Sequence, residues 1–132
     1  MEPVARIKAY FLACSEGTAQ EISSHFVLDA VVFDTNIRPM RTAQGIGQAW
    51  VTVRDRWGGA RWEVESAITD GNTAAIEWRM NGVDAATEKA FVFRGSEHYA
   101  FAGDANLIAE IRQYWTFDPK KLDTRLLDYQ YD

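Results

Sequence analysis

The chain has 132 residues, 47% of them hydrophobic, and this length and composition are those of one globular domain. Its formal net charge is −5, and its basic residues are not grouped into a stripe. We therefore expect neither nucleic acid nor an anionic membrane as a partner. The single cysteine, Cys14, excludes an internal disulfide, and no residues have metal-ligand spacing, so we expect no metal or other cofactor.

Residues 1–6 lack the basic region and long apolar run of a secretion signal. No stretch approaches the length of a transmembrane helix, so we expect a cytoplasmic protein.

The first sixty residues have mostly helical patterns. Pro3 suits a first helical turn, and apolar residues, including Cys14 as a buried thiol, then recur at helical spacing until Gly17. Residues 18–21 form a capping box, which predicts a second, short helix reaching Phe26. A β-rich run over 30–33 ends at Asp34. An irregular stretch then leads to a third helix, which ends at residues 58–59.

From Arg61 onward the pattern alternates, as strands do. Residues 62, 64, 66 and 68 share one predicted strand face, and residues 70–72 form a hairpin signal. A loop over 82–88 precedes a strand around Glu97, and a turn over 103–106 leads to a last strand, residues 107–117.

Three helices followed by an antiparallel meander predict a single α+β domain over residues 1–132. We expect a cone-shaped, strongly curved antiparallel sheet wrapped around the helices, with an internal hydrophobic pocket. The core spans about residues 4–117. The C-terminal tail, residues 118–132, carries enough apolar side chains to predict that it packs against the domain or a second subunit.

Glu97 is the residue whose position is hardest to reconcile with its charge. Strict alternation over residues 91–101 puts it on the same face as Phe91, Phe93, Tyr99 and Phe101. An ionised carboxylate in that aromatic surface would be costly, so we expect Glu97 to hold its proton above the usual acid range and to donate a hydrogen bond. The competing interpretation is a buried ion pair.

The chain resembles the nuclear transport factor 2-like superfamily, and within it the SnoaL-like polyketide cyclases and the ketosteroid isomerases. The resemblance rests on the order of elements and on three segments: residues 30–34 followed by Arg41 and the third helix, residues 97–101, and residues 108–115. Such a scaffold carries many activities, so the resemblance implies the fold more firmly than the reaction.

The ketosteroid isomerase pattern implies roles for three residues. Asp34 falls at its general base, Tyr10 at its oxyanion-stabilising tyrosine, and Glu97 at its protonated acid. A neutral acid of this kind in ketosteroid isomerase is a known case of pKa tuning. Together these groups imply isomerisation or cyclisation of a hydrophobic, carbonyl-bearing molecule through an enolate.

The departures from that pattern leave alternatives open. Glu97 is one methylene longer than the usual Asp, and Asp34 could instead cap the turn at Thr35 and Asn36. Glu77 and Arg79 would serve an epoxide hydrolase-like reaction, although alternation favours an ion pair on the outer face.

A non-catalytic carrier or assembly domain of the same fold is the remaining alternative. A filled cone would favour it, whereas an open pocket of at least about 300 Å³ would favour an enzyme. We expect a homodimer through the outer sheet face and place His98 on that face. We expect Gln113 to form a hydrogen bond with the substrate, and the predicted walls of the pocket are Trp50, Trp62, Trp78, Phe93 and Trp115.

Overall fold

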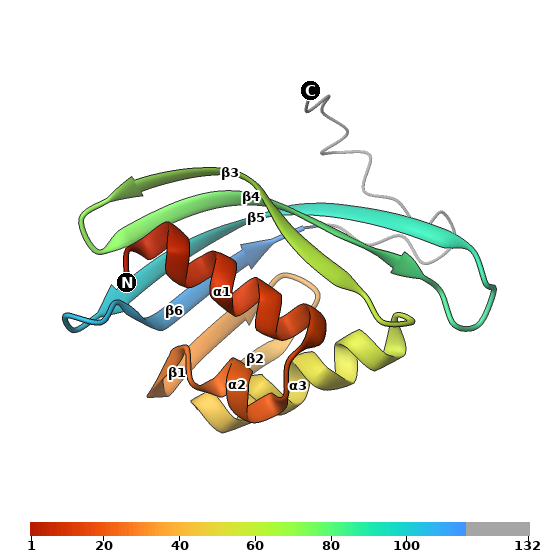
Figure 1. The fold of residues 1–132 in the computed structure, drawn as a ribbon, viewed down its shortest axis with the longest axis horizontal. Coiled ribbons are helices and arrows are strands. Elements are labelled where there is room, and N and C mark those ends of the chain that lie inside the picture. The colour runs from red at the N-terminus through yellow and green to blue at the C-terminus, as the bar shows by residue number, and fades with distance from the viewer. Residues whose placement is uncertain (116–132) are drawn as a thin grey trace.

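The computed structural model describes residues 1–115, which form three helices and a six-stranded sheet (Figure 1). Helix α1 (Pro3–Glu16) begins at a proline and ends at Gly17, as predicted. Helix α2 (Ala19–Ser23) is capped by Thr18, whose side chain accepts a hydrogen bond from the backbone N–H of Glu21. Helix α3 (Ala43–Arg56) completes the layer, and Figure 1 shows all three helices on the same side of the sheet.

The sheet has the strand order β2-β1-β6-β5-β4-β3. Four long strands form the predicted meander: β3 (Arg61–Asp70), β4 (Thr73–Val83), β5 (Ala90–Ala102) and β6 (Leu107–Tyr114). Strand β1 (Phe26–Asp34) then pairs with β6 in parallel, so the sheet is mixed and not wholly antiparallel as predicted. This parallel pairing places Asp34 directly beside Gln113.

Three local predictions were wrong. Phe26 begins strand β1 and is not part of the second helix, which ends at Ser23. The stretch around Pro39 is strand β2 (Ile37–Arg41), an edge strand, where a residue without an N–H is tolerated. Ile68 is 76% exposed, because a register shift between Val64 and Ser66 moves the following residues of β3 to the opposite face.

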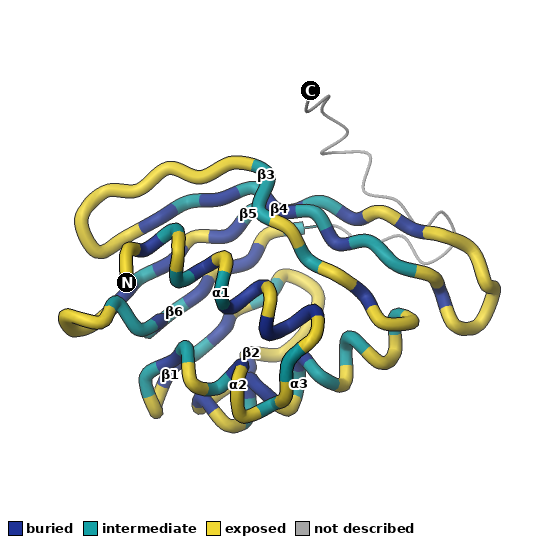
Figure 2. Tube along the Cα trace, in the orientation of Figure 1, coloured by how far each residue is buried: buried dark blue, intermediate teal, exposed yellow. Residues whose placement is uncertain are grey.

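The core lies between the helices and the concave face of the sheet. Figure 2 shows buried positions alternating with intermediate or exposed positions along β4 and β5. Among the described residues, no helix has the length and apolar character needed to cross a membrane. The tail at 118–132 and the predicted end of the last strand at Phe117 lie outside the described residues.

Candidate functional site

Glu97 projects into the core, as its alternation pattern predicts. It is 2% exposed and accepts a hydrogen bond of 2.9 Å from the hydroxyl of Tyr99, two residues along β5. Burial raises the pKa of Glu97 to about 8. The Tyr99 hydroxyl opposes that rise and the charge of Asp34 adds to it. The side chain is therefore mostly neutral at pH 7 and can donate a proton or a hydrogen bond.

Tyr10 and Cys14 lie on the same face of α1, four residues apart, and both are buried. Burial raises the pKa of Tyr10 well above its ordinary value, with Cys14 and Glu97 adding to the effect. Burial also raises the pKa of the Cys14 thiol, so that it is protonated at neutral pH. Tyr10 thus remains a neutral hydroxyl near Glu97.

These groups line one interior cavity between α1, α3 and the sheet. Its free volume is about 10 Å³, enough for about one water. The cone is therefore nearly filled in this conformation, and the volume expected of an open pocket is not present. The cavity is lined by Tyr10, Phe11, Cys14, Trp50, Trp62, Trp78, Glu97 and Gln113.

Asp34 lies at the end of β1, outside that cavity. Its carboxylate accepts hydrogen bonds from Gln113 Nε2 at 2.5 Å, from Trp115 Nε1 at 3.1 and 3.2 Å, and from the Asn36 backbone at 2.7 Å. The contact with Asn36 is the turn-capping arrangement that the sequence left open. Both oxygens of Asp34 are thus occupied by donors.

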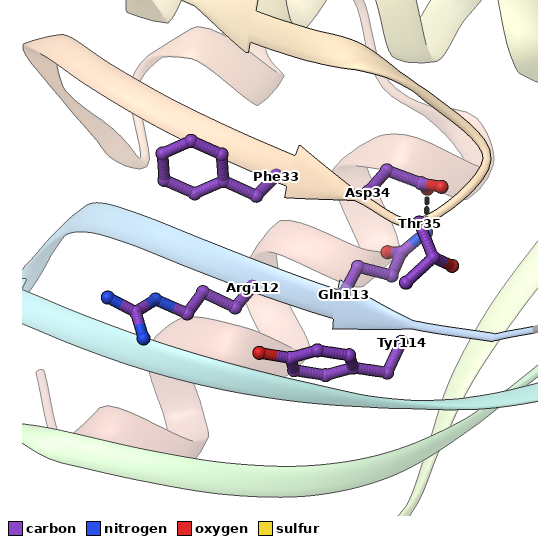
Figure 3. Close-up of a pocket in the computed structure, with 6 residues that line it drawn as sticks. All are labelled: Phe33, Asp34, Thr35, Arg112, Gln113 and Tyr114. Atoms are coloured by element: carbon purple, nitrogen blue, oxygen red, sulfur yellow. Dashed lines mark hydrogen bonds between the residues drawn. The ribbon is translucent and has the colours of Figure 1, made fainter.

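Gln113 separates Asp34 from the cavity. It lines the interior cavity and also an open groove of about 410 Å³ at the ends of β1 and β6, which Asp34 and Thr35 line as well (Figure 3). Gln113 is also the strand partner of both Asp34 and Glu97. The two acids therefore lie on strands β1 and β5, which flank β6 and its Gln113 side chain.

The predicted substrate-binding residues divide into two groups. Trp50, Trp62, Trp78 and Gln113 line the cavity, whereas Phe93 and Trp115 are not among its lining residues. The Phe93 and Trp115 rings lie 5.5 Å apart, and the Trp115 ring also contacts Trp78 at 5.9 Å. Phe93 and Trp115 thus form a second layer behind the wall.

The outer face holds the residues of the epoxide hydrolase-like alternative. Arg79 pairs with Glu63 at 2.6 Å and with Glu65 at 3.4 Å, and the Ser66 hydroxyl donates to Glu77. His98 is exposed and contacts the Tyr114 ring edge-on. None of these side chains lines the interior cavity. Arg79 forms ion pairs on the outer face, as predicted, but its partners are Glu63 and Glu65 and not Glu77.

Sequence reasoning missed three residues of the site: Tyr99, which donates a hydrogen bond to Glu97, and Phe11 and Cys14, which line the cavity. Tyr99 was placed on the Glu97 face but given no role, although residues two apart on a strand are neighbours on one face. Cys14 was assigned only to the core. Its position one helical turn after Tyr10 was the available signal.

Two tryptophans of the cavity have unpaired polar atoms. Trp50 is 6% and Trp78 2% exposed, and the indole Nε1 of each is buried with no hydrogen-bond partner in the described structure. The Trp50 nitrogen lies close enough to the Tyr10 hydroxyl to influence its pKa, but without hydrogen-bond geometry. An unpaired buried donor costs about 1–3 kcal/mol.

The position of Trp78 depends on Gly95, its strand partner on β5. A Cβ at residue 95 would lie 2.3 Å from Trp78 Cζ2 and 2.6 Å from Cε2, so the indole covers the glycine directly. We expect Gly95→Ala to lower the free energy of unfolding by about 2 kcal/mol through overpacking, measured by urea denaturation. In a Trp78→Leu background the same substitution should cost less than half as much, and equal costs in both backgrounds would contradict the contact.

Within residues 1–115 no group of three or more His, Cys, Asp or Glu side chains could hold a metal ion. The arrangement that remains is a neutral acid and a tyrosine in a small aromatic cavity, with an ionisable aspartate one strand beyond its wall. Such groups can donate hydrogen bonds to an oxygen and exchange protons with carbon or oxygen.

Solved structures confirm the fold. A Catenulispora acidiphila protein of ketosteroid isomerase-like fold, in complex with trimethylamine, superposes with a TM-score of 0.77 at 15% identity, over 85% of each chain. A Mycobacterium tuberculosis protein in complex with estradiol-17β-hemisuccinate gives a TM-score of 0.72 at 13% identity, over 88% of this chain and 95% of that one.

A Xanthomonas campestris protein described as a putative polyketide cyclase gives a TM-score of 0.71 at 13% identity, over 86% of this chain and 90% of that one. No curated protein matches the chain. The sequence itself matches the SnoaL-like domain over residues 7–111, most of its length. The chain therefore belongs to the SnoaL-like domain family, within the nuclear transport factor 2-like superfamily.

Proposed function

We propose that this domain binds a small, hydrophobic, carbonyl-bearing molecule inside the cone and performs cofactor-independent acid–base chemistry on it. The observation that carries the proposal is Glu97, a buried acid with its pKa raised to about 8, lining the same cavity as Tyr10. A neutral acid and a neutral phenol are donors suited to an oxygen on which negative charge develops.

The proposed reaction is isomerisation or cyclisation through an enolate. Asp34 removes a proton from the carbon beside the carbonyl, and the C–H electron pair moves into the enolate while Tyr10 and Glu97 donate to its oxygen. The proton then returns to carbon, or the enolate carbon attacks a second carbonyl of the same molecule, forming a C–C bond while the oxygen of that carbonyl takes up the proton from Asp34. Because Gln113 lies between Asp34 and the cavity, its side chain has to move aside for this step.

Proton exchange tests this proposal without knowledge of the natural substrate. The protein is incubated in D₂O with small cyclic ketones such as 1-tetralone, and deuterium at the carbon beside the carbonyl is followed by mass spectrometry. We expect exchange well above the rate in buffer. A rate equal to that of buffer for every ketone tested would overturn the enolising reaction.

The near-filled cavity favours a second candidate, a binding domain without turnover. About 10 Å³ of accessible space admits no steroid or polyketide unless the lining side chains move apart, and the Asp34 carboxylate is fully engaged. The complexes of the two solved relatives with estradiol-17β-hemisuccinate and with trimethylamine support ligand binding on this fold. Binding of a ketone without proton exchange would favour this candidate.

We also propose a homodimer formed through the outer face of the sheet. That face exposes apolar side chains, among them Tyr114 at 47% and Val92 at 40%. Exposed apolar surface on a curved sheet is a common basis of symmetric dimers. Light scattering at micromolar concentration should give twice the 15.0 kDa mass of the chain, and a mass of one chain would contradict the proposal.

A further inference from the structure

The unpaired indole N–H groups of Trp50 and Trp78 indicate that the ligand carries a hydrogen-bond acceptor. This inference rests on the proposed function. Trp50 comes from α3 and Trp78 from β4, so two separate elements bring an indole to the lining of one cavity. Neither Nε1 has hydrogen-bond geometry to an acceptor within the described structure, although the Trp50 indole lies beside the Tyr10 hydroxyl. Buried N–H groups in native proteins are nearly always paired, so two unpaired donors at one cavity indicate an acceptor supplied from outside the fold.

The charge of the cavity limits what that acceptor can be. Its lining residues include no Lys, Arg or His among the described part of the chain, and Glu97 is their only acid. A carboxylate or phosphate ligand would find no positive charge there, and it would repel Glu97 whenever that side chain ionises. An uncharged oxygen, such as that of a ketone, lactone or quinone, fits the donors without this cost.

The walls limit the shape of the ligand. Trp50 and Trp62 meet edge to face, with ring centroids 6.0 Å apart, and Trp78 and Phe11 also line the cavity. Rings on several sides of a small space favour a flat molecule of one or two rings.

We propose that Trp50 and Trp78 are ligand-positioning residues whose indole N–H groups bind an uncharged oxygen of a flat one- or two-ring molecule. The role is separate from that of Asp34, which transfers the proton, because it concerns where the ligand oxygen is held, beside the Tyr10 and Glu97 donors of the same cavity. Trp62 serves as the matched control. It lines the same cavity, but its indole nitrogen is not among the buried unpaired atoms.

The experiment compares the affinities of 1-tetralone and tetralin, which have the same carbon skeleton with and without the carbonyl, by calorimetry. Wild-type protein should bind 1-tetralone about 3- to 10-fold more tightly than tetralin. In Trp50→Phe and in Trp78→Phe that preference should be smaller than in wild type, because each variant loses one of the donors, whereas Trp62→Phe should keep it. In ¹⁵N–¹H spectra the indole signals of Trp50 and Trp78 should move downfield with 1-tetralone and not with tetralin.

The possible failures are distinguishable. If both molecules bind equally, or if all three variants lose the preference alike, the indole proposal is overturned while ligand binding stands. Preferential binding of 1-naphthoate would overturn the uncharged acceptor. If neither molecule binds, even at millimolar concentration, the proposed function fails and the indole proposal fails with it.

Discussion

The free energy of unfolding should fall as pH rises from about 5 to about 9, and Glu97→Gln should remove this fall. The folded-state pKa of Glu97, about 8, lies above the ordinary value of 4.5. Between these values the folded chain holds a proton that the unfolded chain has released, so raising the pH favours the unfolded state. Over this pH range the difference corresponds to about 4 kcal/mol, a large part of the stability of a small domain.

Urea denaturation at a series of pH values measures this effect. Gln at residue 97 is close in shape to the neutral acid and can still accept the Tyr99 hydrogen bond, so the variant should match wild type near pH 5 and be more stable at pH 9. Glu88→Gln, at an exposed position in the loop before β5, should keep the wild-type slope. Equal pH dependence in Glu97→Gln and wild type would show that Glu97 does not hold its proton.

Asp34→Asn should lower the rate of ketone proton exchange by about 10²–10³-fold, because an amide cannot act as the base. The fold should survive, since the amide oxygen introduced at this position can still accept a hydrogen bond from the Gln113 side chain. Asp29→Asn is the matched control, an exposed aspartate on the same strand, and should leave the rate unchanged.

The pH profile provides a second readout for Asp34→Asn. The wild-type rate should fall above about pH 8 as Glu97 loses its proton, and the residual rate of the variant should fall over the same range. Full activity in Asp34→Asn, with an unchanged melting temperature, would remove Asp34 from the mechanism. The cavity groups alone would then have to account for the exchange.

The burial of Glu97 could be predicted because β5 alternates without interruption over its whole length. In β3 the same reasoning failed at Ile68, since a single extra residue in the ladder reverses every later side chain. The sequence gives no sign of that register shift. Strand β2 was missed for a related reason: proline is rare in strands, and only its place at the edge makes it acceptable.

The surroundings of Asp34 were beyond sequence reasoning. Its position at the end of a strand was correct, but its donors, Gln113 and Trp115, lie 79 and 81 residues further along the chain. Those contacts follow from the parallel pairing of β1 with β6, which the expected antiparallel sheet did not contain. The size of the cavity could not be predicted from the sequence either, because it depends on how each aromatic side chain is oriented.

The parallel pairing of β1 and β6 also has a consequence for how the protein reaches its native state. Strands β3, β4 and β5 are joined by short connections and pair with neighbours in sequence, so they can form early. The ladder between β1 and β6 closes a loop of about eighty residues and is expected to form later. A chain arrested before that step would have Glu97 and Trp78 in place but would lack the aspartate on the far side of Gln113.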